Sequence, residues 1–238
     1  SDATGTISIT VGALRNISIV DAAGKNGSAI DTLTLTSDAD YTFYLAGYDQ
    51  DQNFIRNVNT KWTIQGSIGS LSTGESYSTS TVFTASTVGS GAIKADTASF
   101  SDVTGAIKVT LGSLAKLKIR DGTNGGGVEV GDLSLTTDES VLLYAASYDN
   151  DDNYLGDVSV TWSKTGTLDD VSGDQSSYTF APSTAPSSGT IVVKKSGVSS
   201  DATGTISITV GALRNISIVD AAGKNGSAID TLTLTSDA

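Results

Sequence analysis

The sequence predicts an all-β fold built from tandem antiparallel β-sandwiches arranged end to end. The first observation is the period-two alternation of apolar and polar residues in short stretches bounded by Gly, Asn or Asp, as at residues 7–11. This alternation is typical of half-buried strands. The second is that no stretch carries apolar residues at helical spacing over a useful length. The third is an internal repeat, which indicates a stacked array of like modules.

The repeat has two levels. Residues Ser1–Ala39 recur without a change as Ser200–Ala238, an offset of 199 residues. A weaker match at an offset of 100 residues joins the stretch from Thr4 to Trp62 with the stretch from Thr104 to Trp162. The unit is therefore about a hundred residues long, and it exists in two diverged versions that alternate along the chain.

This period sets the expected domain boundaries. Residues 1–12 are predicted to be the last strand of a preceding repeat, 13–112 and 113–211 two complete domains, and 212–238 the first strands of a following repeat. We therefore expect a longer native chain that forms a fibre by itself. Short Gly-Ala or Gly-Ser junctions between repeats limit bending, so the array is expected to be a semi-rigid rod.

Within each repeat the strands are expected in a fixed order. Apolar alternation predicts strands at 14–19, 33–36, 44–48 and 58–62, with turns rich in Gly, Asn and Asp at 23–27, 49–53, 72–74 and 89–91. The second repeat follows the same order, with its residue numbers shifted by 100 up to Trp162. Trp62 and Trp162 are expected in the cores, packed between two sheets.

Composition excludes several classes of function. Cys, His and Met are absent, so disulfides, thiolate or imidazole metal sites and Ser-His or Cys-His catalysis are excluded. The net charge of −12 argues against nucleic acid as a partner, because phosphate binding needs basic patches. The apolar runs are far shorter than the roughly 20 residues of a membrane span. We expect the protein not to be an enzyme.

The motifs of both repeats resemble bacterial immunoglobulin-like domains of the invasin and intimin type, which are strung together in surface proteins. The residues that carry the resemblance are Leu14–Ile19, Leu33–Thr36, Tyr44–Asp49, Asn53 and Val58–Trp62, with Tyr144–Asp149, Asn153–Val158, Val160–Trp162 and Tyr178–Pro182 in the second repeat. The resemblance covers the whole chain and implies tandem immunoglobulin-like sandwiches. Gln52 and Asp152 stand where the family often has Gly, which leaves the turn type open.

The turn after each Tyr-x-x-x-Tyr strand is the candidate site. Carboxylate and amide oxygens alternate at Asp49, Asp51 and Asn53, and again at Asp149, Asp151 and Asn153. Oxygen ligands at alternate positions suit Ca²⁺, although the pattern is not an EF-hand. The alternative is a metal-free polar turn in which Asx side chains bond the local backbone. No other cofactor is expected.

The resemblance implies an extracellular or cell-surface location and a structural function. The leading hypothesis is the repeating shaft of an extracellular fibre, stalk or giant surface protein. Its partners would be further copies of the same repeat, in the same chain or in neighbouring chains of a filament. The alternative is an adhesin segment that binds a carbohydrate or protein ligand through its loops, for which Tyr44, Tyr48, Tyr144 and Tyr148 offer a candidate surface.

Overall fold

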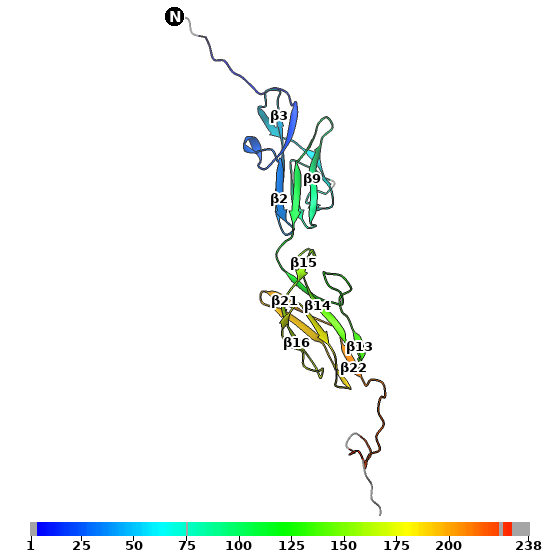
Figure 1. The fold of residues 1–238 in the computed structure, drawn as a ribbon. Coiled ribbons are helices and arrows are strands. Elements are labelled where there is room, and N and C mark those ends of the chain that lie inside the picture. The colour runs from blue at the N-terminus through cyan, green and yellow to red at the C-terminus, as the bar shows by residue number, and fades with distance from the viewer. Residues whose placement is uncertain (1–3, 75, 224–225, 230–238) are drawn as a thin grey trace, which may run out of the picture.

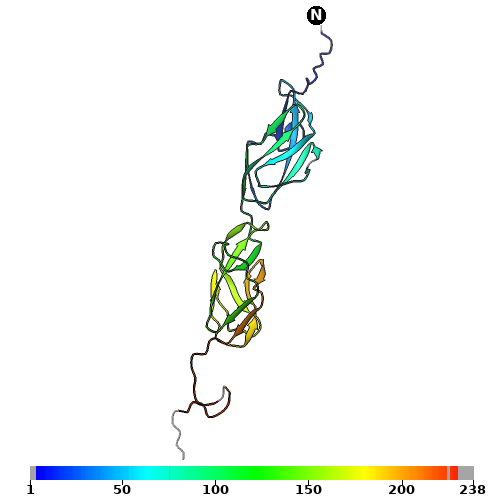
Figure 2. The same cartoon turned by 90° about the vertical axis from the view of Figure 1, so that its right-hand side faces the viewer.

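The computed structural model describes residues 4–74, 76–223 and 226–229. Two elongated β-sandwiches follow one another along the chain, end to end (Figures 1 and 2). We call them module A, from β1 (Asn16–Val20) to β11 (Ala106–Thr110), and module B, from β12 (Lys116–Arg120) to β22 (Ile206–Thr209). The predicted all-β, immunoglobulin-like class is confirmed.

Module A consists of two facing sheets. The first has the order β1, β3 (Asp40–Tyr48), β8 (Ser80–Ala85) and β6 (Gly69–Leu71), with β4 (Phe54–Asn57) also paired to β3. The second has the order β2 (Thr32–Thr36), β11, β9 (Gly89–Asp96), β5 (Thr60–Gln65) and β7 (Tyr77–Ser78), with β10 (Ser101–Val103) on β9. The β2–β11 pair is parallel, so the last strand closes the module against one of its first strands.

Module B repeats this plan. One sheet joins β12, β14 (Val141–Tyr148) and β15 (Tyr154–Asp157), with β18 (Ser177–Phe180) on β14. Facing it are β13 (Leu133–Thr136), β22 and β19 (Ser187–Gly189), and the group β17 (Asp174–Gln175), β16 (Val160–Lys164), β20 (Ile191–Lys195) and β21 (Val198–Ala202). The parallel closing pair recurs as β13–β22.

Each module buries one tryptophan at the centre of its core. Trp62 and Trp162 are each 1% exposed, and their indole nitrogens donate to the carbonyls of Ser78 (3.1 Å) and Gln175 (2.8 Å). A buried indole needs such an acceptor because an unpaired N–H would be costly. The predicted core role of both tryptophans is confirmed.

Helical structure is limited, in the described residues, to the short 3-10 turn η1 (Gly24–Asn26). It lies in the predicted turn at 23–27, where the carboxylate of Asp21 accepts the backbone N–H of Ser28 at 2.8 Å. The identical sequence downstream makes the same bond, from the N–H of Ser227 to Asp220 at 2.8 Å. This loop therefore takes its shape from local contacts. None of the described segments forms an apolar helix long enough to cross a membrane.

One repeated sequence occurs in two different environments. Ile206 and Ile208 lie in β22 and are 0% and 2% exposed, whereas the equivalent Ile7 and Ile9 are 77% and 92% exposed. Residues 4–12 pair with no strand, while β22 has β13 and β19 beside it. Likewise, the described part of 212–238 carries one isolated bridge, Val219–Ala228, and residues 1–3, 224–225 and 230–238 lie outside the described residues. The assignment of 1–12 and 212–238 to neighbouring repeats stays a prediction.

Because each module has its own core, we expect core truncations to act within one module. Ile119→Ala removes a fully buried side chain of module B and should cost that module roughly 2–5 kcal/mol. In a Trp62→Phe background, Trp162 fluorescence reports the denaturant midpoint of module B alone.

The matched variant is Ile19→Ala in module A, with the Trp62 signal read in a Trp162→Phe background. Each variant is read in both backgrounds. If Ile119→Ala lowered the denaturant midpoint of module A as much as that of module B, the two cores would unfold as one unit.

Candidate functional site at the joint between the modules

The two modules meet where β11 leads into β12 through Gly112 and Ser113. On the module A side lie the turn after β2, at residues 37–39, and Ser86 after β8. On the module B side lies the turn between β14 and β15, at residues 149–153, and Figure 1 shows β15 at the end of module B that faces module A. We call this contact, made by Ser37, Asp38, Ser86, Gly112, Ser113, Asp149 and Asn153, the joint.

The turn on the module B side is built by local hydrogen bonds. Asp149 Oδ1 accepts the backbone N–H of Asp151 at 3.0 Å and that of Asn153 at 2.9 Å. This is an Asx-type turn, in which a side-chain carboxylate satisfies the backbone of the next residues. Asp152 takes a φ of 64° without being glycine, a left-handed conformation that is uncommon for other residues.

Module A contains the same turn at its N-terminal end, away from module B. Asp49 accepts the N–H of Asp51 at 3.0 Å and of Asn53 at 2.8 Å, and Gln52 also has a φ of 64°. The turn type left open by the sequence is therefore the same in both modules.

The Asp149 carboxylate also fastens module A to module B. Its Oδ2 accepts the hydroxyl of Ser37 in module A at 2.5 Å and the linker N–H of Gly112 at 3.1 Å. The Asn153 side-chain amide, which donates to Asp149 at 2.9 Å, also donates to the carbonyl of Ser86 at 2.9 Å. One charged group thus binds its own turn, the linker and the neighbouring module.

The linker is held from the other side as well. The N–H of Ser113 donates to Asp38 Oδ2 at 3.1 Å. A Cβ placed on Gly112 would lie 2.8 Å from Ser37 Oγ and 2.8 Å from Asp38 Cγ, closer than real Cβ contacts. A larger residue at this position would push the Ser37 and Asp38 side chains away from the linker, and glycine avoids this.

Burial and hydrogen bonding shift the pKa of the Asp149 carboxylate in opposite directions. Asp149 is 0% exposed, and this burial raises its pKa, but the hydrogen bonds from Ser37, Asn153 and Gly112 outweigh it and lower the pKa to about 2. At the N-terminal end of module A, the backbone N–H of Gly12 and the donors of Asn53 lower the pKa of Asp49 to about 2. Both carboxylates are ionised at neutral pH.

The six predicted calcium ligands are brought together only in part. Asp49 contacts Asn53 and Asp149 contacts Asn153, but each asparagine presents its NH₂ group, a donor, to the aspartate. Asp51 and Asp151 contribute backbone N–H groups, and their side chains are exposed. In the described part of the chain, no three acidic residues gather closely enough to hold a metal ion. Calcium stays a prediction of the sequence, and the contacts match its alternative, the polar turn.

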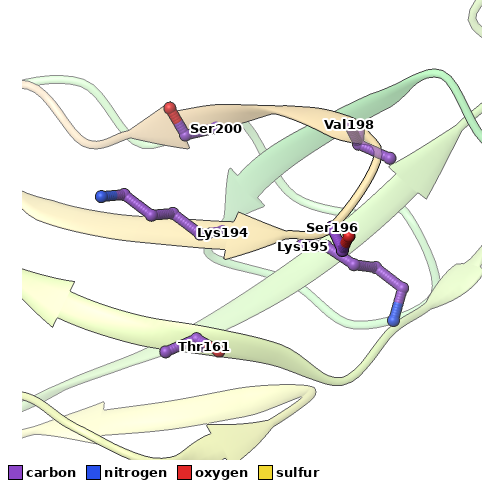
Figure 3. Close-up of a pocket in the computed structure, with 6 residues that line it drawn as sticks. All are labelled: Thr161, Lys194, Lys195, Ser196, Val198 and Ser200. Atoms are coloured by element: carbon purple, nitrogen blue, oxygen red, sulfur yellow. The ribbon is translucent and has the colours of Figure 1, made fainter.

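A hollow on the side of module B does not bring reactive groups together. The hollow in Figure 3, of about 400 Å³, lies beside the β20–β21 hairpin of module B and is lined in part by Lys194 and Lys195. The two lysine side chains point in different directions in Figure 3, and Lys195 Nζ donates to the carbonyl of Ser159 at 3.0 Å.

The predicted tyrosine surface is partly buried. Tyr148 is 7% exposed and packs edge-on against Tyr154, as Tyr48 does against Phe54. Among the aromatic side chains that the structure describes, Tyr77, at 68%, is the most exposed, and the others are buried or half-buried.

Sequence reasoning found the aspartate turn but missed its partners in module A. Ser37, Asp38 and Ser86 lie in loops with no apolar pattern. A signal was available in the weak repeat, where Ser37-Asp38 and Thr137-Asp138 both keep a hydroxyl followed by a carboxylate.

No protein-family model and no curated protein match this chain. Solved structures with similar folds include domains 4–9 of the surface-layer protein SbsC, at 17% identity and a TM-score of 0.31 over 83% of this chain and 32% of that one. They also include the Escherichia coli adhesin FdeC, at 14% identity and a TM-score of 0.37 over 86% of this chain and 67% of that one. An intimin fragment, solved in complex with the intimin-binding domain of the translocated intimin receptor, matches at 14% identity. Its TM-score is 0.28, over 83% of this chain and 64% of that one. The chain spans about a third of the SbsC fragment.

Removing the Ser37 hydroxyl should release the joint carboxylate. In Ser37→Ala, Asp149 loses a donor from module A, so its pKa should rise from about 2 toward the ordinary value of 3.8. A hydrogen bond to a charged group contributes roughly 1.5–3 kcal/mol. Carboxyl ¹³C NMR titration measures the change, and Ser37→Thr, which keeps the hydroxyl, is the control. An unchanged Asp149 pKa in Ser37→Ala would contradict the contact.

The joint should also depend on pH. Because the folded pKa of Asp149 is depressed below 3.8 to about 2, the ionised carboxylate stabilises the joint fully above about pH 4, and this is lost as the pH falls through about 2. Small-angle scattering should show a constant particle shape down to about pH 4, then increased flexibility near pH 2. Flexibility that is equal at neutral pH and at acid pH would count against the joint.

Proposed function

We propose that this chain is a repeating segment of the shaft of an extracellular fibre, stalk or giant surface protein. The observation that carries the proposal is the joint, in which the buried Asp149 carboxylate binds Ser37 of module A and the linker N–H of Gly112. A chain whose task is to span distance needs successive modules that keep a fixed direction. A free hinge between them would shorten the reach.

The position of the contacts supports stiffness. Ser37 and Ser86, which lie in different loops of module A, each bind the turn of module B. Asp38 holds the linker at Ser113. Bending at the linker would separate at least one of these pairs and leave a buried polar group unsatisfied, which costs about 1–3 kcal/mol.

The surface supports a spacer more than a ligand-binding module. Aromatic side chains are enriched among the residues that dominate the binding energy of protein interfaces, and among the described residues Tyr77 is the one exposed aromatic side chain. The net charge of −12 keeps an extended chain soluble. With His and Cys absent, the usual nucleophile and base pairs of enzymes are missing.

The gap-free repeats support the same conclusion. Two stretches of 39 residues are identical, and the weaker match between modules runs without a gap from Thr4 to Trp62. Arrays of like modules set length and stiffness, whereas a binding segment is expected to show one copy with an enlarged loop.

Electron microscopy of native material, with gold-labelled antibodies raised against this chain, tests the proposal. We expect label along uniform extracellular filaments or stalks whose axial repeat equals two modules. Label confined to the cell interior, or to filament tips alone, would overturn the shaft, and tip labelling would favour the adhesin.

Calcium titration separates the two alternatives for the aspartate turns. Because N–H donors occupy Asp49 and Asp149, we expect the same melting temperature with excess Ca²⁺ and with a chelator. A bound ion would instead stabilise the modules by about 2.7 kcal/mol at a hundred times its Kd, a shift easily seen by calorimetry. Mg²⁺ at equal ionic strength is the control.

A further inference from the structure

The structure contains one complete joint, from module A to module B, and the two halves of a second kind. One half is the far end of module B, around Thr137 and Gly211. The other is the near end of module A, around Gly12 and Asp49. We propose that these surfaces dock on each other between successive copies of the repeat, so that Thr137 and the following Asp49 form a B–A joint. This partner assignment rests on the proposed shaft.

The far end of module B presents the same groups as the far end of module A. Thr137 stands where Ser37 does, and the N–H of Ala212 donates to Asp138 at 2.8 Å as that of Ser113 donates to Asp38. The difference lies at the linker glycine, whose N–H donates to Thr137 Oγ1 at 3.0 Å. In the complete joint that N–H goes to the aspartate of the next module.

The near end of module A presents the receiving groups. Gly12 is the sequence equivalent of Gly211, and its N–H donates to Asp49 Oδ2 at 3.0 Å, as Gly112 does to Asp149 at 3.1 Å. A hollow of about 350 Å³ lies beside Asp49 and is lined by Gly12 and Asn53 among others. At the corresponding place beside Asp149 stands the Ser37 hydroxyl.

The solvent exposures of the equivalent residues agree with two surfaces that are covered in the complete joint and uncovered at the ends of this chain. Ser37 is 0% exposed in the complete joint, whereas Thr137 is half-buried. Asn153 is half-buried beneath module A, whereas Asn53 is exposed. When the halves meet, the Gly211 N–H donates to Asp49 of the next copy in place of Thr137 Oγ1, and the Thr137 hydroxyl donates to the same carboxylate.

One contact would be specific to the B–A joint. Arg214, the equivalent of Arg15, lies 3.7 Å from Asp138. The position that corresponds to Arg15 in module B is Ala115, so the A–B joint has no such pair. An ion pair present in one kind of joint and absent from the other favours module A after module B, which matches the order in the sequence.

The test uses the full chain lengthened after Ala238 by a second copy of residues 40–112, which completes the third module. Because the chain has no cysteine, spin labels can be placed at Ser200→Cys in module B and at Ser99→Cys in the added module. We expect one narrow distribution of distances between the two labels. A second pair of labels, placed at the equivalent positions of modules A and B, should give a distribution that is equally narrow across the A–B joint.

Thr137→Val removes the hydroxyl and should broaden the distance distribution. Thr137→Ser keeps the hydroxyl and should leave the distribution narrow, because a serine hydroxyl donates to the aspartate at Ser37. Thr179→Val, on the exposed face of β18, is the matched control, and the melting of module B checks that Thr137→Val folds. A broad distribution in the unsubstituted chain, or a narrow one in Thr137→Val, overturns the B–A joint. The proposed shaft has a separate test: it is overturned if the distances between the labels across the A–B joint are also broadly distributed.

Discussion

The buried carboxylate of Asp149 is the constraint on which the arrangement of this chain depends. An ionised group with no solvent exposure is tolerated only when hydrogen-bond donors surround it. Here the donors come from three places: its own turn, the linker at Gly112 and the Ser37 hydroxyl of the other module. The Ser37 hydroxyl is the donor that comes from module A, so the position in which all three sources bind the carboxylate is favoured over other relative positions of the modules.

The aspartate turn connects two strands and also binds the neighbouring module, and its backbone is strained at one residue. Gln52 and Asp152 both adopt a φ of 64°, which costs a non-glycine residue roughly 1–2 kcal/mol. The hydrogen bonds of Asp49 and Asp149 to the following N–H groups hold this shape. At Asp152 the side chain also gains ion pairs with Lys116 and Lys118, each at 3.1 Å, which a glycine could not make. The strained turn thus presents the carboxylate to the neighbouring module in a fixed direction.

The fold could be predicted from the sequence because its signals are local and repeated. Alternation at Leu33 and Leu35 predicted β2, and the valine and tryptophan pattern ending at Trp62 placed that indole in the core. The short strand β4 was missed because it directly follows the polar turn at Asn53 and has little alternation of its own.

The joint could be predicted only in part, because contacts between loops carry no periodic signal. The oxygen pattern at Asp149 indicated the correct turn, with Ca²⁺ and a metal-free polar turn as the two alternatives, but it did not indicate a contact with module A. Nothing in a lone serine indicates that it meets an aspartate 112 residues later. Pattern also does not ensure pairing: residues 7–11 alternate perfectly but remain exposed, since a strand needs neighbours to bury its apolar face.

Residual dipolar couplings measured on the full chain at neutral pH test the central claim most directly. If the joint holds the modules as described, backbone N–H couplings from module A and module B will fit one alignment tensor with a single orientation and magnitude. Two tensors of clearly different magnitude would mean that the modules reorient independently. The Asp149 contacts would then not fix the direction of the chain.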